Sequence, residues 1–197
     1  NDIARLHTIG ADGVGLFRSE YLFMNRKDSP DESEQFNFYK AAVAAMNGKP
    51  VTIRTLDIGA DKELSTDDYE TSVNPALGLR AVRYCLANPS MFVTQIRAIL
   101  RASHYGSIKL LIPMVSGVEQ LQQTLHLIEK ARKQLREADM PFDEQLPIGV
   151  MIEIPSAALI LHALLSAKSR IVIFNFCWSP AALSLVMPVC CSRKLST

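Results

Sequence analysis

The sequence predicts an α/β fold in which helices cover a parallel sheet. Short apolar runs alternate with longer stretches of helical period, which is typical of strand–helix units joined by right-handed crossovers. Arginine and acidic residues stand at the ends of several apolar runs, where the strands of a barrel place functional side chains. We therefore expect a partial (β/α)8 TIM barrel with about five to six of its eight units.

The first half of the chain contains two clear strand signals. The apolar runs at residues 13–17 and 51–56 are expected to be strands, and the helical pattern at residues 32–46 lies between them. Turn residues that include Gly48 and Pro50 end this helix. A short element near residues 77–79 is expected after a polar segment, and it counts toward the five units.

The second half continues the alternation. Asn88 is a candidate N-cap for a helix whose first position is Pro89. In chain order we expect helices at residues 81–86 and 89–102, a strand at 108–113, an amphipathic helix at 118–138, a strand at 148–154, a helix at 156–165 and a possible sixth strand at 171–174.

The composition changes near the end of the chain. No Asp or Glu follows Glu153, whereas three of the four cysteines and the only tryptophan lie beyond it: Cys177, Cys190, Cys191 and Trp178. Residues 180–189 show no clean helical or strand period. We therefore divide the chain into a partial barrel domain at residues 1–165 and an irregular, divergent tail at residues 166–197, which we suspect is frameshifted or otherwise foreign.

Charge and hydropathy exclude several classes of partner. A formal net charge of +1 gives no reason to expect nucleic acid or an anionic membrane. The apolar runs are shorter than the ~20 residues of a membrane span, and the N-terminus lacks the apolar core of a signal peptide. We expect a cytoplasmic protein, and the absence of an initial methionine suggests a longer parent chain. No GxGxxG or GxxxxGK loop follows any expected strand, which argues against a dinucleotide-binding or Walker-type nucleotide site.

Three arginines stand at the polar ends of apolar runs. They are Arg18 in GVGLFRSE, Arg54 in VTIRTLD and Arg80 in NPALGLRAVR. If the ends of these runs share one edge, the three guanidiniums converge on an anion such as a phosphate or a carboxylate. For Arg18 and Arg54 the alternative is a structural ion pair with Glu20 or Asp57, and Arg80 could instead fix the loop that precedes it.

Glu153 is the best candidate metal ligand. It lies between Ile152 and Ile154 in a run that is expected to be buried. A buried carboxylate is costly unless it is paired or bound to a cation. The histidines have no partner spacing, so none is assigned as a phosphoryl acceptor.

Six strings in order carry a resemblance to a known family. They are GADGVGLFRSEYLFM, VTIRTLDIGADKEL, NPALGLRAVR, QIRAILRAS, LLIPMVSGVEQ and IGVMIEIPSAA, spread over residues 10 to about 160. Together they resemble the phosphoenolpyruvate (PEP)-binding barrel of enzyme I of the bacterial phosphotransferase system. Pyruvate phosphate dikinase and PEP synthase share that barrel, but RTLDIGADKEL and LFMNR look closer to enzyme I.

The resemblance implies transfer of the phosphoryl group of PEP to a histidine, with Mg2+ required, in a reaction that feeds sugar uptake. By resemblance, the arginines that match Arg18 and Arg54 hold the phosphate, and the glutamate that matches Glu153 is a Mg2+ ligand. We add Arg80 to the expected PEP-binding residues. The implied partners are PEP, a phosphocarrier protein that acts through a domain outside this chain, and a second copy in a homodimer.

The chain also departs from this family. The GTNDL string with the second Mg2+ carboxylate and the GMCGE string with the catalytic cysteine are both absent, as is the domain that carries the phosphorylated histidine. We therefore assign no catalytic residue and expect the chain to be inactive alone. The alternatives are a fragment of a dikinase or PEP synthase, a non-catalytic PEP-binding module, and a decayed gene product.

Overall fold

One parallel sheet organises the structure. The computed structural model describes residues 10–24, 26, 28–59, 78–166 and 171–175, the last of these by backbone only. Within these ranges the five strands are all parallel and lie side by side in sequence order. They are β1 (Val14–Arg18), β2 (Val51–Arg54), β3 (Ile108–Ile112), β4 (Ile148–Ile152) and β5 (Ile171–Asn175). The expected α/β class is confirmed.

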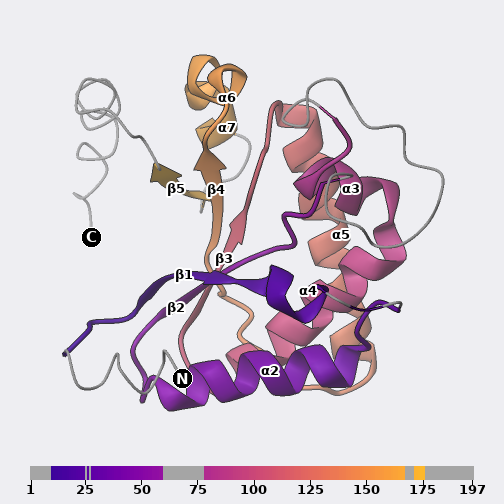
Figure 1. The fold of residues 1–197 in the computed structure, drawn as a ribbon, viewed down its shortest axis with the longest axis vertical. Helices are drawn as coiled ribbons and strands as arrows, with labels where there is room; N and C mark the ends of the chain where they lie inside the picture. Colours follow the sequence, from indigo (N-terminus) through magenta and orange to yellow (C-terminus); the bar gives the residue numbers. More distant parts are fainter. Residues whose placement is uncertain (1–9, 25, 27, 60–77, 167–170, 176–197) are drawn as a thin grey trace.

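Helices connect successive strands, and the long helices lie together on one side of the sheet, whereas α6 and α7 lie at the end of β4 (Figure 1). The three long ones are α2 (Glu32–Ala45), α4 (Pro89–Ser103) and α5 (Val118–Glu137), and α4 packs against both of the others. The shorter elements are η1 (Ser19–Leu22), α3 (Ala81–Ala87), α6 (Pro155–Leu159) and α7 (Leu161–Ser166). Within the described residues, every helix is too short or too polar to be a candidate membrane span.

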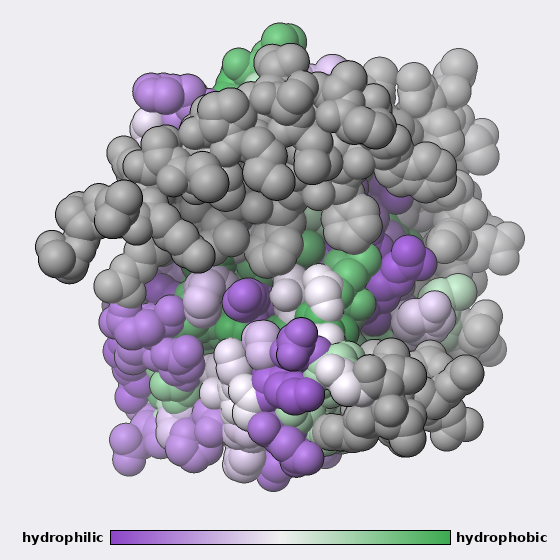
Figure 2. Space-filling view, turned by 90° about the vertical axis from the view of Figure 1, so that its left-hand side faces the viewer, coloured by the Kyte–Doolittle hydropathy of each residue, from purple (hydrophilic) through white to green (hydrophobic). Residues whose placement is uncertain are grey.

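The core lies between the sheet and this helical layer. Ile53, Leu110 and Val150 of the strands are fully buried together with Ile96 and Ile99 of α4. Burial of such side chains is the main favourable term in folding, worth roughly 1.5–3 kcal/mol for each. On the face shown in Figure 2, hydrophobic residues are visible near the middle, and hydrophilic residues lie at the left and through the lower middle.

Two expected elements differ from the structure. Gly78 and Leu79 form a bend rather than a strand, and only an isolated antiparallel bridge joins Gly59 to Arg80; Leu77 lies outside the described residues. Both α3 and α4 therefore lie between β2 and β3. The helix expected at residues 156–165 is split into α6 and α7, because Ile160 leaves the helical conformation at φ −101° and ψ 17°.

The expected N-cap residue of α4 is found in place, but its side chain does not cap the helix. Pro89 occupies the first turn and Asn88 the N-cap position, but the Asn88 side chain makes no capping hydrogen bond. Its Nδ2 donates instead to the carbonyl oxygen of Tyr84 at 3.1 Å, because α3 ends at the same residue. The possible strand at residues 171–174 is confirmed as β5, whereas residues 176–197 lie outside the described ranges.

We expect Ile96→Ala to destabilise the fold by about 2–5 kcal/mol, since Ile96 is fully buried between α4 and the sheet and truncation leaves a cavity. Urea unfolding followed by circular dichroism measures the change. Leu159→Ala is the control, because Leu159 is 88% exposed and its truncation should change stability by only about 0.5 kcal/mol. Equal effects of the two substitutions would contradict the position assigned to α4.

Candidate functional site

The carboxyl edge of the sheet carries the candidate site. Arg18 is the last residue of β1 and Arg54 is the last residue of β2, and the two are paired in register. Glu153 directly follows β4. The strand ends therefore bring Arg18 and Arg54 side by side, as the sequence predicts for parallel neighbours.

Four charged side chains form a continuous ion-pair series, which we call the charge chain. Glu20 Oε1 accepts a hydrogen bond from Arg54 Nη2 at 2.5 Å, and Arg54 Nη1 lies 3.1 Å from Asp57 Oδ2. Asp57 Oδ1 accepts in turn from Arg80, at 2.9 Å from Nη2 and 3.3 Å from Nε. Negative and positive side chains alternate along the charge chain. Its two inner members, Arg54 and Asp57, therefore each face two side chains of opposite charge.

Much of the charge chain is buried. Only 12% of the Arg54 side chain and 8% of the Asp57 side chain are exposed, whereas Arg80 keeps 26%. Buried ions are tolerated when opposite charges and hydrogen bonds replace water. This compensation is incomplete, because Arg54 Nε and Glu20 Oε2 are buried without a hydrogen-bond partner. Arg54 thus retains an unused buried donor that an anion could satisfy.

Arg18 differs from the other two arginines. Its side chain is exposed at the end of β1, and it has no ion-pair or hydrogen-bond partner within the described ranges. The predicted alternative of an ion pair between Arg18 and Glu20 is not found, because Glu20 pairs with Arg54 on the neighbouring strand. No acidic side chain of the described residues therefore occupies the Arg18 guanidinium, which belongs to the strand end next to that of Arg54.

Glu153 lies near the charge chain and is held by an irregular backbone. Its Oε1 accepts the backbone N–H of Met114 at 2.6 Å, and Met114 has a φ of 56°, which a residue with a side chain rarely adopts. Burial raises the pKa of Glu153, and the negative charge of Asp57 adds to the rise. The Met114 N–H and the guanidiniums of Arg54 and Arg80 oppose it. Sequence reasoning missed the part played by Met114, because only the folded backbone brings this N–H to Glu153.

The residues at this edge fit Mg2+ in part. Glu153 supplies a hard oxygen donor, and its Oε2 has no hydrogen-bond partner among the described residues. Both Asp57 oxygens already face arginines. Mg2+ often uses only one or two carboxylates and completes its shell with phosphate oxygens and water. Within the described residues, no group of three or more His, Cys, Asp or Glu side chains is placed to hold a metal ion.

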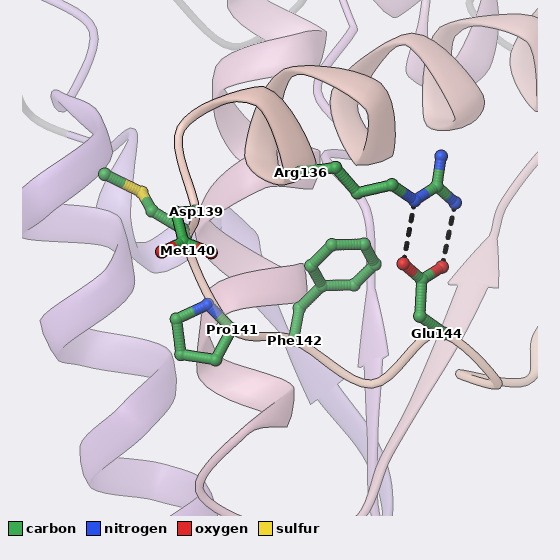
Figure 3. A pocket seen from close by; sticks show the side chains of 6 residues that line it. All are labelled: Arg136, Asp139, Met140, Pro141, Phe142 and Glu144. Carbon is green, nitrogen blue, oxygen red and sulfur yellow. Dashed lines mark hydrogen bonds and ion pairs between the residues drawn. The ribbon is translucent and has the colours of Figure 1, made fainter.

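A surface cavity of about 370 Å³ lies away from these residues, beside the loop between α5 and β4 (Figure 3). It is lined by Arg136, Asp139, Met140, Pro141, Phe142 and Glu144. Arg136 pairs with Glu144 through two hydrogen bonds of 2.8 Å and with Glu129 at 3.0 Å. Because these carboxylates neutralise the guanidinium, the cavity offers an anion no unpaired positive charge.

Comparisons with known proteins match most of the chain. Residues 1–173 match the family model described as "PEP-utilising enzyme, PEP-binding domain". The chain is 57% identical over 155 residues to a phosphoenolpyruvate-protein phosphotransferase of Cupriavidus necator, covering 77% of this chain and 26% of that protein. It is 46% identical over 151 residues to the phosphoenolpyruvate-protein phosphotransferase of Priestia megaterium, with the same two coverages.

A third relative is the multiphosphoryl transfer protein 2 of Escherichia coli, which is 44% identical over 152 residues. The match covers 77% of this chain and 18% of that protein. The chain thus spans about a quarter of the length of the first two relatives and less of the third.

We expect Glu153→Gln to stabilise the protein at pH 7. The raised pKa means that the folded state disfavours the Glu153 carboxylate relative to the unfolded chain, so ionisation lowers stability as pH rises through that pKa. A glutamine removes this cost and keeps an oxygen for the Met114 N–H. Urea midpoints measured from pH 7 down to about 4 should show the gain shrinking as both states become protonated.

Asp12→Asn is the control for this series, because Asp12 is an exposed acidic residue. A gain from Glu153→Gln that stays constant over the pH range would contradict the electrostatic origin of the effect.

Proposed function

We propose, from the premise that the chain belongs to the PEP-utilising enzymes through their PEP-binding domain, that it binds PEP at the carboxyl edge of its sheet. The observation that carries the proposal is the pair formed by Arg18 and Arg54. One guanidinium is exposed and has no partner among the described residues, and the other has a buried Nε without a partner. Two guanidiniums on adjacent strand ends suit a phosphate, which accepts several charge-assisted hydrogen bonds.

The proposed fold is a segment of a (β/α)8 barrel. In a doubly wound sheet the strand order reverses at a switch point, and helices cover both faces. Here strands β1 to β5 follow one another in sequence order without reversal, and the long helices lie on one side (Figure 1). These features support a barrel segment, in which ligands bind at the carboxyl ends of the strands.

The proposed ligand matches the charges of the site. PEP carries a phosphate and a carboxylate, both of which accept bidentate hydrogen bonds from guanidinium groups. Arg18 and Arg54 would hold the phosphate. Arg80 pairs with Asp57 on the side of that carboxylate away from Arg54, and its side chain is more exposed than that of Arg54. We include Arg80 among the residues that contact PEP, because the side of its guanidinium away from Asp57 can still donate.

Mg2+ bound through Glu153 would neutralise charge on the phosphoryl oxygens. Glu153 carries a carboxylate with one oxygen already fixed by Met114, so the other oxygen has a defined direction. A bound cation would also favour the ionised form of Glu153 against the effect of burial.

The proposed parent enzyme is a phosphoenolpyruvate-protein phosphotransferase of the enzyme I type, which transfers the phosphoryl group of PEP to a histidine. During such a transfer, negative charge is spread over the phosphoryl oxygens, so fixed positive groups supply most of the catalysis. Arg18 and Arg54 would orient the phosphoryl group and stabilise that charge. The phosphocarrier protein and a second copy of the chain are the proposed partners of the parent enzyme.

We expect the chain to bind PEP in the presence of Mg2+, and Arg18→Ala to weaken this binding by about 10- to 100-fold, the value of one or two charge-assisted hydrogen bonds. Isothermal titration calorimetry measures the affinity. Arg18 is the first choice because removing Arg54 would leave the buried carboxylates of Glu20 and Asp57 without their shared partner.

Arg136→Ala is the matched control, since it removes an arginine that lines the cavity beside the α5–β4 loop, and it should leave PEP affinity unchanged. If the unaltered chain binds no PEP at millimolar concentration with Mg2+ present, the proposed function fails. Equal loss of affinity in both variants would show that binding is not at the carboxyl edge.

A further inference from the structure

Gln95 is a fully buried polar residue in the middle of α4. It belongs to the string QIRAILRAS, to which the proposed site assigns no role. Its side-chain amide makes three hydrogen bonds. Oε1 accepts the backbone N–H of Leu56 at 3.0 Å, and Nε2 lies 3.2 Å from both Ser19 Oγ and Tyr39 Oη.

Two of these partners belong to the segments that carry the charge chain. Ser19 lies between Arg18 and Glu20, directly after β1. Leu56 directly precedes Asp57, shortly after the end of β2. One amide from the helical layer therefore connects the two backbone segments that present the site arginines and their acidic partners.

The position of Gln95 is itself fixed by ion pairs between helices. On the same helix, Arg97 Nε lies 2.6 Å from Glu32 Oε2 and Arg101 Nη1 lies 2.7 Å from Glu32 Oε1. Glu32 is the first residue of α2, and these contacts lower its pKa against the effect of burial. With Ile96 and Ile99 buried in the core, α4 has little freedom to shift relative to α2 and the sheet.

The hydrogen-bonding needs of the strand ends explain why a glutamine occupies this position. The last sheet-type bond of this segment runs from the Thr55 N–H to the Leu111 carbonyl at 2.9 Å, so the next N–H, that of Leu56, needs another acceptor. A glutamine offers this acceptor together with two donors for the hydroxyl groups. An apolar side chain of equal size would leave the Leu56 N–H buried and unpaired.

Gln35 provides an internal comparison. It is also fully buried, its Nε2 donates to the Pro30 carbonyl at 2.9 Å, and its Oε1 lies 3.5 Å from the Tyr39 hydroxyl. Its partners, Pro30 and Tyr39, both lie outside the segments that follow β1 and β2. The two glutamines therefore share burial and one partner, and they differ in their connection to the site.

We propose that Gln95 is a positioning residue for the anion site. It holds the segment Arg18–Ser19–Glu20 against the segment Arg54–Thr55–Leu56–Asp57, so that the exposed Arg18 and the unpartnered Nε of Arg54 face the same ligand. This inference rests on the proposed function for the nature of the ligand, but the order of the Arg54 side chain is observable without any ligand.

The experiment compares Gln95→Met with Gln35→Met in the full chain. Both substitutions remove buried hydrogen bonds at nearly constant volume, so both should lower the urea midpoint. Only Gln95→Met should weaken binding of PEP with Mg2+, by about tenfold, as expected for a small displacement of binding groups. A second readout is the Nε–Hε cross-peak of Arg54 in a nitrogen-15 spectrum of the ligand-free protein, assigned by its loss in Arg54→Lys.

We expect this cross-peak to be narrow in the unaltered chain and in Gln35→Met, and broadened or split in Gln95→Met. If Gln95→Met does not fold, Ser19→Ala removes only the bond to the β1 end and should cause a smaller change in the same direction. The inference would be overturned if folded Gln95→Met left both the cross-peak and the PEP affinity unchanged. It would also be overturned if Gln35→Met changed both readouts as much as Gln95→Met does. If the unaltered chain binds no PEP, the proposed function fails and the cross-peak alone decides the role of Gln95.

Discussion

The alternating charge chain Glu20–Arg54–Asp57–Arg80 is the constraint on which the candidate site depends. Two guanidiniums at the edge of one sheet repel each other, and burial strengthens that repulsion because little water screens it. Placing Asp57 between Arg54 and Arg80, at 3.1 Å and 2.9 Å, offsets this repulsion without a ligand. The arrangement still leaves Arg54 Nε unpaired, so the site keeps capacity for an anion.

The helical layer gives this edge its geometry. Glu32 joins α2 to α4 through Arg97 and Arg101, and α4 presents Gln95 to the segments after β1 and β2. A binding site at the ends of separate strands needs such connections, because each strand supplies only one or two of its groups. On the next pair of strands the link is the Met114 N–H bond to Glu153, which depends on an unusual backbone conformation.

Most strands could be predicted from the sequence because their apolar runs are long enough to be buried in a sheet. Residues 108–113 and 148–154 enclose β3 and β4 as observed. The element expected near residues 77–79 was wrong for Gly78 and Leu79, which form a bend. The apolar run there is very short, and the neighbouring Arg80 forms only an isolated bridge to Gly59. Boundaries such as the break between α6 and α7 depend on packing rather than on local pattern.

The sequence by itself determined the α/β class and the places of Arg18 and Arg54 at strand ends, because these follow from local periodicity. It placed Glu153 inside a buried strand at residues 148–154, whereas β4 ends at Ile152 and Glu153 directly follows it. Only the tertiary structure decided the partners. Glu20 pairs with Arg54 across the sheet instead of with nearby Arg18, since β1 and β2 are neighbours in register. The hydrogen-bond partners of Gln95 were likewise decided by the tertiary structure. They lie 39 and 76 positions away along the sequence, and no local pattern encodes contacts at such sequence separations.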